Sequence, residues 1–271
     1  SDNFPLVEQE KLTNPELILT PSGKKVLDFG QNIAGIVSFS VNAKEGQRIF
    51  LRFGELMKDG EFTQKNIQCV KKNHASPLQQ VEYFCKEGLN EYKTTFAIFG
   101  YQYIEVEADM EIDPSAFTAI AVYTDFEITF TFDSSNQLLN QFVKNTLWSL
   151  KNNSADLPTD CPTRERHGWS GDAQIFVNTA SYMVNYAPFA LKYENDLCDW
   201  QKKNGNFPQI APEGGTDSYM KTMNGSVGWS DAGILIPYRL WKKYGDRSSI
   251  EKYYENMKHY AQYMISRTGK T

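Results

Sequence analysis

The hydrophobic pattern of the chain changes its period near residue 130, and this change constrains the fold more than any other feature. Between Lys25 and Asp133, short β-branched and aromatic runs alternate apolar with polar residues, as expected for strands that bury one face. Beyond that point, apolar residues recur at intervals of three and four, which is the spacing of amphipathic helices. The sequence therefore predicts an all-β region, residues 1–130, followed by an all-α region, residues 131–271.

The β region is predicted to form an antiparallel β-sandwich. Turn signals such as Glu45-Gly46, Asp59-Gly60 and Phe99-Gly100 separate its apolar runs. Many short strands with turns between them are typical of sandwich folds. The expected strands are Val26, 36–41, 48–53, 81–84, 94–99, 103–107 and 117–123.

This β region could itself bind carbohydrate, with Glu55, Tyr101 and Tyr103 as contacts. The alternative, which we favour, is that the region packs against the helical domain and that its aromatic side chains fill its own core.

The helical region is predicted to begin with a helix capped by Asp133 or Ser134. One face of that helix is apolar and consists of Leu138, Leu139, Phe142, Val143, Leu147 and Leu150. Asp172 could both cap the next helix and serve a functional site. The later helices are expected at 172–185, 188–203, 230–244 and 248–266.

Residues 160–172 concentrate the chemically reactive side chains of the sequence. They read Asp-Cys-Pro-Thr-Arg-Glu-Arg-His-Gly-Trp-Ser-Gly-Asp. Proline and glycine disfavour both helix and strand, so this segment is predicted to be a loop.

The composition of this loop suits the cleavage of a glycosidic bond. An acid must protonate the glycosidic oxygen, further carboxylates can hold hydroxyl groups, and an indole offers a platform for the sugar ring. Arginine can keep selected carboxylates ionised. The alternative is a surface turn rich in ion pairs, because clusters of charges are usually solvated.

The run from Pro158 to Gln174 resembles the catalytic-loop signature of the bacterial α-L-rhamnosidases, the inverting glycoside hydrolases of family 78. Two further blocks match that family in the same order. The first is Asp28-Phe-Gly-Gln-Asn-Ile-Ala-Gly35 with Arg52-Phe-Gly-Glu-Leu56, and the second is Trp229-Ser-Asp-Ala232 with Tyr244-Gly-Asp246. The resemblance implies a jelly-roll-like β-sandwich followed by the first part of an (α/α)6 toroid.

The resemblance also implies roles for individual residues. Glu165 aligns with the general acid, which must hold a proton at the working pH, so a guanidinium bound to it would argue against this role. Asp160 and Asp172 align with acidic residues that hold rhamnose hydroxyl groups and are needed for activity. Arg164 could contact the sugar or orient a carboxylate, and Trp169 could form a wall of the subsite.

The spelling Arg-Glu-Arg-His at 164–167 departs from that of many relatives, which have another acidic residue before the glutamate and leucine in place of His167. This difference bears on the assignment of the acid to Glu165.

Trp229 and Asp231 match a second block that lines the same funnel in the family; alternatively, they mark a helix start with Trp229 packed beneath it. The Gly/Pro-rich segment 204–215 is expected to border the site, as long connections often do.

An inverting hydrolase also needs a general base, and no residue of this sequence matches the motif of that base in the family. About five helices are expected, against about twelve in a full toroid. The chain, which begins at Ser1 without Met, is therefore expected to be a fragment that lacks the remainder of the catalytic domain. This segment alone is predicted to be inactive.

The predicted substrate is a rhamnose-containing oligosaccharide, polysaccharide or glycoside. A net charge of −5 argues against a nucleic-acid partner, and no apolar run approaches the length of about 18 residues that spans a membrane. The first thirty residues lack the layout of a signal peptide, so the sequence leaves the compartment open.

Neither a metal nor a cofactor is predicted, because the cysteines have no metal-ligand spacing. Cys69 and Cys85 could pair across a hairpin, but buried unpaired thiols are favoured. Two alternatives to a rhamnosidase stay open: a non-catalytic carbohydrate-binding or scaffold protein that kept the fold, and a toroidal glycosidase of other specificity.

Overall fold

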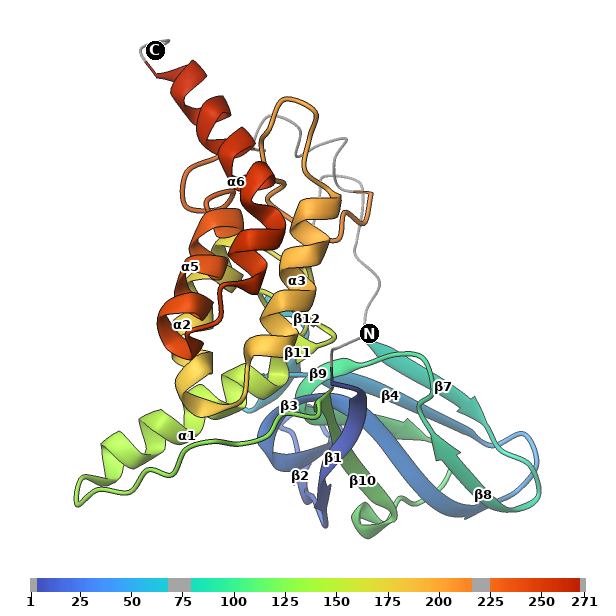
Figure 1. The fold of residues 1–271 in the computed structure, drawn as a ribbon. Helices are drawn as coiled ribbons and strands as arrows, with labels where there is room; N and C mark the ends of the chain where they lie inside the picture. The colour runs from blue at the N-terminus through green and yellow to red at the C-terminus, as the bar shows by residue number, and fades with distance from the viewer. Residues whose placement is uncertain (1–3, 68–78, 216–224, 269–271) are drawn as a thin grey trace. The chain divides into compact units, whose positions relative to one another are not determined.

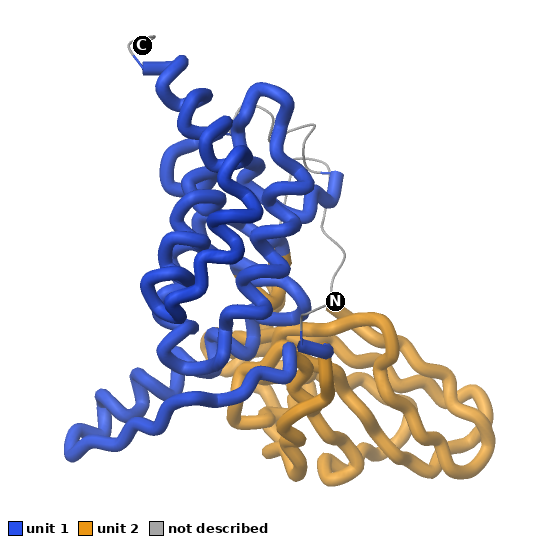
Figure 2. The backbone as a smooth tube through the Cα atoms, viewed as in Figure 1, with its two compact units in different colours: residues 1–5, 124–160, 167–271 blue, residues 6–123, 161–166 orange. Residues whose placement is uncertain are grey.

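The structure is a computed structural model that describes residues 4–67, 79–215 and 225–268. The chain divides into two compact units, which Figure 2 distinguishes by colour. The β unit consists of residues 6–123 and 161–166, and the helical unit consists of residues 1–5, 124–160 and 167–271. The predicted order of β structure followed by helices is confirmed. The domain boundary near residue 130 stays a prediction.

The β unit is built around one eight-stranded, curled sheet (Figure 1). Its strands follow the order β1-β10-β3-β9-β4-β7, and β2 and β8 also pair with β3. Strand β3 is 19 residues long, which lets its two ends pair with different neighbours as the sheet curls. The strands are β1 (Leu6–Thr13), β2 (Glu16–Leu19), β3 (Lys25–Ala43), β4 (Arg48–Gly54), β7 (Gln80–Phe84), β8 (Gly88–Lys93), β9 (Phe99–Ala108) and β10 (Phe117–Thr124), with a separate hairpin of β5 (Leu56–Lys58) and β6 (Glu61–Thr63).

Aromatic side chains fill the core of the β unit. Phe53 and Phe99 stack with their ring centroids 4.2 Å apart, and Tyr101 packs edge-on against Phe53. Tyr101 is fully buried, and its hydroxyl donates a hydrogen bond to the Ile36 carbonyl at 2.7 Å. The core alternative is therefore confirmed for Tyr101, which a sugar cannot reach.

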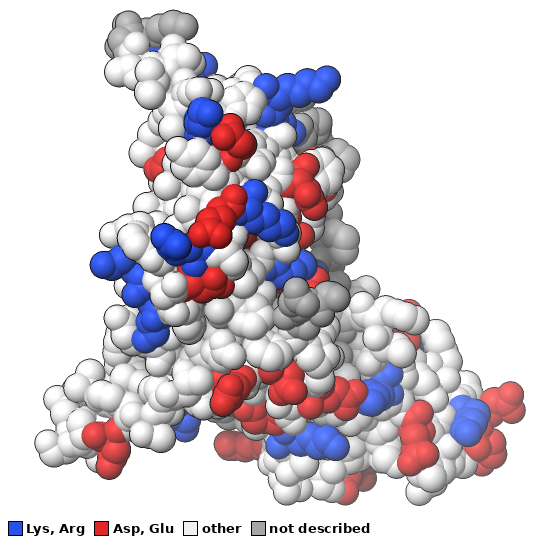
Figure 3. Space-filling model, in the orientation of Figure 1, with Lys and Arg blue, Asp and Glu red and all other residues white. Residues whose placement is uncertain are grey.

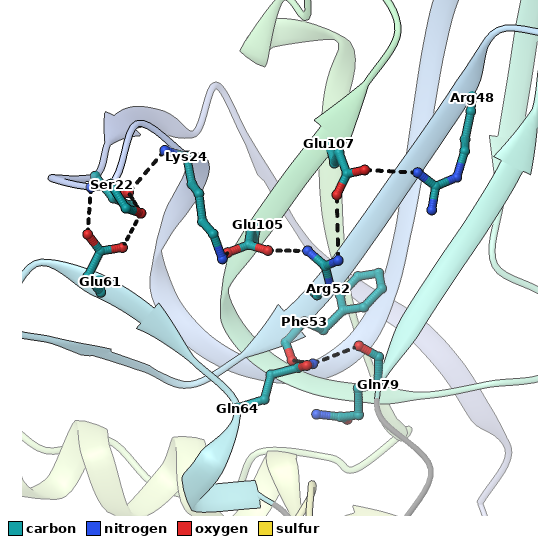
Figure 4. Close-up of polar contacts among 11 residues, drawn as sticks. Ser22, Lys24, Arg48, Arg52, Phe53, Glu61, Gln64, Gln79, Glu105 and Glu107 are labelled. Atoms are coloured by element: carbon teal, nitrogen blue, oxygen red, sulfur yellow. Dashed lines mark hydrogen bonds and ion pairs between the residues drawn. The ribbon is translucent and has the colours of Figure 1, made fainter.

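A ladder of ion pairs crosses strands β4 and β9 (Figure 4). The carboxylate of Glu105 is buried, and it accepts hydrogen bonds from Lys24 at 2.9 Å and from Arg52. Glu107 pairs with Arg48 at 3.0 Å and with Arg52 at 3.5 Å. The two cations bound to Glu105 offset the cost of burying its charge.

Two sequence predictions in the β unit are wrong. Residues 94–98 connect β8 to β9 instead of forming a strand, because Thr94 bonds the Val37 carbonyl and Phe96 is fully exposed. Gly100 lies inside β9 and does not form a turn. A Cβ atom at Gly100 would lie 2.3 Å from Cγ2 of Thr163, so glycine is needed there for a close approach.

In the helical unit, α5 contacts α2, α3 and α6, and these helices lie side by side (Figure 1). The helices expected after the loop are confirmed to within a few residues. The cap of the first helix is not as predicted: the Asn136 side chain, and neither Asp133 nor Ser134, accepts from the amides of Leu138 and Leu139. The helices are α1 (Gln137–Asn152), α2 (Ser170–Met183), α3 (Ala187–Asp199), α5 (Ala232–Tyr244) and α6 (Ser248–Arg267).

Acidic and basic side chains intermingle on the face that Figure 3 shows. Within the described residues, every helix is too short or too polar to cross a membrane. Cys85 is buried. Its proposed partner Cys69 lies outside the described residues.

Candidate active site

The predicted catalytic loop contributes residues to both units. At its base, the Asp160 amide donates to the His167 carbonyl at 3.1 Å, and the His167 amide donates to Oδ1 of Asp160 at 3.1 Å. These two residues belong to the helical unit, whereas residues 161–166 between them belong to the β unit. Glu165 is thus carried by one unit and the aspartates of the loop by the other.

Asp160 and Asp172 line the same pocket of the helical unit, which has a volume of about 260 Å³. Carboxylates, hydroxyls and an amide face apolar side chains across this pocket, a mixture that suits a small polar ligand with an apolar face. The sugar-binding roles of these two aspartates stay predictions. The lining residues are Ser149, Leu150, Asn153, Ser154, Pro158, Thr159, Asp160, Asp172, Ala173, Ile175, Phe176 and Tyr186.

Asp172 lies in the first turn of α2, but the prediction that it caps this helix is wrong. The cap position is Trp169, whose side chain makes no capping hydrogen bond. A carboxylate in the first turn is nevertheless stabilised by the helix dipole. The carboxyl oxygens of Asp172 can accept hydrogen bonds from sugar hydroxyl groups.

Two pocket residues were missed by the sequence analysis because their signal is weak. Asn153 holds the end of α1 by donating to the Ser149 carbonyl at 3.0 Å, and its Oδ1 accepts from the Thr159 hydroxyl at 3.2 Å. The sequence Asn-Asn-Ser at 152–154 matches only the short pattern of a glycosylation acceptor. Tyr186 is also buried, which raises the pKa of its phenol and keeps it neutral.

The Gly/Pro-rich segment 204–215 is hydrogen-bonded to the end of the predicted catalytic loop and to the start of α2, and its place beside the site stays a prediction. The Ser170 amide donates to the Gln209 carbonyl at 2.7 Å, and the Ala211 amide donates to the Gly168 carbonyl at 3.0 Å. The Tyr193 hydroxyl also donates to Gly168, at 2.7 Å. These bonds fix the start of α2, whose first turn contains Asp172.

Trp229 and Asp231 lie just before the start of α5, and their side chains make different contacts. The indole of Trp229 covers Gly171, where a Cβ would lie 2.8 Å from Nε1, and it remains 40% exposed. Asp231 accepts from the Tyr260 hydroxyl and from the Gly228 amide, both at 2.7 Å. Asp231 therefore serves a structural purpose, while its predicted contact with substrate stays a prediction.

The carboxylate of Glu165 is bound by its neighbour. Its Oε1 accepts from Nε of Arg164 at 3.0 Å and from Nη2 at 2.5 Å. A guanidinium favours the ionised carboxylate, which opposes the protonated state that the acid role requires. The Arg164 side chain is 48% exposed and that of Glu165 is 24% exposed. Because pairs of this kind contribute only about 0–1 kcal/mol, the guanidinium can move away at little cost.

Among the described residues, no group of three or more His, Cys, Asp or Glu side chains could hold a metal ion.

Comparison with known sequences assigns the fold and loop to a family. The sequence model of the bacterial alpha-L-rhamnosidase 6 hairpin glycosidase domain matches residues 127–271. The model of the bacterial alpha-L-rhamnosidase concanavalin-like domain matches residues 18–123. The chain belongs to the bacterial α-L-rhamnosidase family. Its helices accordingly represent part of an α/α toroid.

Individual relatives agree with this assignment. An alpha-L-rhamnosidase of Alteromonas sp. (strain LOR) is 31% identical over 268 residues, which cover 96% of this chain and 28% of that protein. One from Streptomyces avermitilis is 32% identical over 243 residues, covering 89% of this chain and 22% of that protein. The chain thus spans about a quarter of the length of these relatives.

Solved structures show the same fold. The crystal structure of Streptomyces avermitilis alpha-L-rhamnosidase complexed with L-rhamnose matches with a TM-score of 0.89 and 29% identity, covering 98% of this chain and 25% of that one. The alpha-L-rhamnosidase from Dictyoglumus thermophilum matches with a TM-score of 0.88 and 30% identity, covering 98% and 29% of the two chains.

Proposed function

We propose that this chain carries the general acid and part of the sugar pocket of an inverting α-L-rhamnosidase, with terminal α-L-rhamnosides as substrates. Membership of the bacterial α-L-rhamnosidase family carries the proposal. The pocket shared by Asp160 and Asp172 supports it, since two carboxylates can accept hydrogen bonds from adjacent sugar hydroxyl groups. The Streptomyces avermitilis relative was solved with L-rhamnose bound.

In the proposed mechanism, Asp160 and Asp172 bind the rhamnose ring and Trp169 and Trp229 contribute apolar surface to it. Glu165 donates its proton to the glycosidic oxygen as the bond to the anomeric carbon breaks. A water molecule, deprotonated by a second carboxylate, attacks the opposite face of the ring, so that the configuration inverts. The proton on Glu165 is then restored from solvent.

The hydrogen bonds from Arg164 to Glu165 must break before Glu165 can act as the acid. Glu165 can take up a proton only when the guanidinium no longer holds its carboxylate. We propose that Arg164 turns toward the bound sugar, which is one of the two roles that the sequence suggested for it. The small stability of a half-exposed ion pair makes this exchange possible.

Substitution of Glu165 by glutamine tests the acid role. In the full-length protein, hereafter the parent polypeptide, Glu165→Gln should lower hydrolysis of an aryl α-L-rhamnoside by at least about a hundredfold. Binding of L-rhamnose, measured by calorimetry, should persist. With the unsubstituted parent polypeptide, NMR of the first-formed rhamnose should show the β anomer. Unchanged hydrolysis would exclude Glu165 as the acid, and a first-formed α anomer would exclude inversion.

The second candidate function is a non-catalytic protein that binds carbohydrate. The ion pair between Arg164 and Glu165 favours it, because a permanently ionised Glu165 can bind hydroxyl groups but cannot donate a proton. A parent polypeptide that binds L-rhamnose but hydrolyses no member of a panel of aryl glycosides would establish this alternative. Hydrolysis of another glycoside in the same panel would instead indicate a different specificity.

A further inference from the structure

The turn that carries Glu165 is anchored in the β unit at a second carboxylate, that of Glu55. Glu55 follows β4 directly, and its side chain is half-buried. Oε2 of Glu55 accepts a hydrogen bond from the Thr163 hydroxyl at 3.2 Å, and Oε1 accepts from Nδ2 of Asn32 at 3.0 Å. Because each oxygen has a donor, the carboxylate is fixed between strand β3 and the turn.

The position of Asn32 follows from an irregularity in β3. The pairing of β3 with β9 shifts register between Asp28 and Ile33. Within this stretch Gly30 has a φ of +73°, and its amide donates to Oδ1 of Asp28 at 2.7 Å. Such bulges redirect individual side chains without ending a strand, and here the redirected side chain is the one that binds Glu55.

The other side of Thr163 packs on the sheet itself. Its methyl carbon lies only 2.3 Å from the ideal position of a Cβ on Gly100, so a side chain at Gly100 would collide with it. Gly100 is in turn fixed by Gln79, whose Oε1 accepts from the Gly100 amide at 2.8 Å and whose Nε2 donates to the Gly100 carbonyl at 3.1 Å. Gln64 donates to the Gln79 carbonyl at 2.9 Å (Figure 4). Thr163 therefore packs against a glycine whose backbone amide and carbonyl are both held by hydrogen bonds.

The chain on the other side of Glu165 is also tied to the β unit. Arg166 has a φ of +54°, a left-handed conformation that costs a non-glycine residue roughly 1–3 kcal/mol. Its guanidinium donates to the Ile98 carbonyl at 2.9 Å. Two contacts, one before and one after Glu165 in sequence, thus hold this residue in one orientation within the β unit.

We propose that Glu55 is a positioning residue for Glu165, acting through Thr163; this inference rests on the acid role proposed above. In this role Glu55 acts through the turn and needs no contact with the substrate. It fixes the turn so that the carboxyl of Glu165 is presented in one place. The β domain then has a part in catalysis, because it determines where the proton donor stands.

Variants in the parent polypeptide test this inference. Glu55→Gln and Thr163→Val should each lower kcat roughly tenfold to a hundredfold on a rhamnoside with a poor leaving group, because small displacements of a catalytic group are costly. KM should change by less than about threefold, since sugar binding is untouched. Thr163→Val retains the methyl packing on Gly100, whereas Thr163→Ser retains the hydroxyl and should keep kcat near the wild-type value.

Substrates with different leaving groups distinguish a misplaced acid from a general loss of active-site structure. A dinitrophenyl rhamnoside needs little protonation to depart, so Glu55→Gln and Thr163→Val should hydrolyse it at nearly the wild-type rate. The double variant should be no worse than the poorer single variant if both act through one hydrogen bond. Glu61→Gln is the matched control. Its carboxylate also accepts from a hydroxyl, at 2.7 Å, but the donor is Ser22, so its kinetics should match those of the wild type.

The outcomes separate this inference from the function on which it rests. If Glu165→Gln leaves hydrolysis intact, the acid assignment fails and the positioning role fails with it. If Glu165→Gln abolishes hydrolysis while Glu55→Gln and Thr163→Val stay within about twofold of wild type, below the usual cost of a displaced catalytic group, only the positioning role is overturned. Equal losses on both leaving groups would also overturn it, because they indicate damage unrelated to the proton donor.

Discussion

At Glu194, a carboxyl group on α3, burial outweighs every neighbouring group that could stabilise the charge. The side chain is fully buried, and its pKa is raised from 4.5 to about 8, mainly by burial. Ser249 and Lys252 on α6 act in the opposite direction but more weakly. The same carboxyl also helps to raise the pKa of the Cys198 thiol, after burial as the main cause. Glu194 is therefore neutral in the folded protein at neutral pH.

The raised pKa of Glu194 predicts a specific pH dependence of stability. Between pH 4.5 and about 8, the unfolded chain has released a proton that the folded chain keeps, so the stability contributed by this group falls as pH rises through that window. Glu194→Gln removes the dependence. Between urea unfolding at pH 5 and at pH 8.5, the free energy of unfolding of the variant should rise relative to that of the wild type by on the order of a few kcal/mol.

The exposed Glu251 on α6 provides the control for this comparison, because Glu251→Gln removes a carboxyl from the same helical unit without changing a buried group. Parallel stability curves for the wild type and Glu194→Gln would contradict the assignment.

At the scale of elements, α5 depends on one glycine for its packing. A Cβ at Gly233 would lie 2.3 Å from the ring of Phe207, which is fully buried and packs against Tyr260. Helix propensity alone would favour alanine over glycine by about 1 kcal/mol. Overpacking of a core costs about 1–3 kcal/mol, so the steric clash outweighs helix propensity and a change to alanine lowers the stability.

Gly233→Ala should accordingly destabilise the helical unit by about 1–2 kcal/mol net, read from the midpoint of urea unfolding. Gly214→Ala is the control, since its Cβ would meet no atom within 4 Å. A Gly233→Ala variant that is more stable than the wild type would show that Phe207 can move aside.

Helix α1 presents an apolar face to solvent. Leu138 is 84% exposed and Phe142 is 66% exposed, whereas Leu150 near the other end is buried. These residues belong to the apolar face that the sequence predicted for this helix. Exposed apolar surface costs roughly 25 cal/mol per Å² relative to its burial, which makes this face a strong candidate for burial by other helices of a toroid.

At the scale of the whole molecule, the family assignment and the span of the chain lead to a prediction about activity. The chain spans about a quarter of the length of its relatives, and no residue in it matches the base motif of the family. The proposed inversion requires a base about 6.5–9.5 Å from the acid. We therefore predict that the 271-residue chain alone shows no turnover of an aryl α-L-rhamnoside, whereas the parent polypeptide hydrolyses it. Turnover by the chain alone that Glu165→Gln abolishes would show that a carboxylate within it serves as the base.

Local sequence pattern was enough to predict the order of β structure and helices and the place of the reactive loop. Periodicity and turn chemistry are local properties, so α5 and its end at Gly245, with a φ of +73°, follow from neighbouring residues alone. The family resemblance likewise depends on contiguous motifs. Local pattern was less reliable where polar residues dominate, as in β1 and β8, which were not predicted.

The contacts of individual residues depend on parts of the chain that are distant in sequence and meet in the folded protein. Gly100 has the local appearance of a turn residue, but it lies in β9, where it pairs with Ala34 of β3, and Thr163, distant in sequence, packs against it. The binding of Asp231 by Tyr260 and of Thr163 by Glu55 likewise joins segments that no local pattern relates. Close approaches and hydrogen bonds of this kind depend on the positions of folded elements in space, which is why they become visible only once the chain has folded.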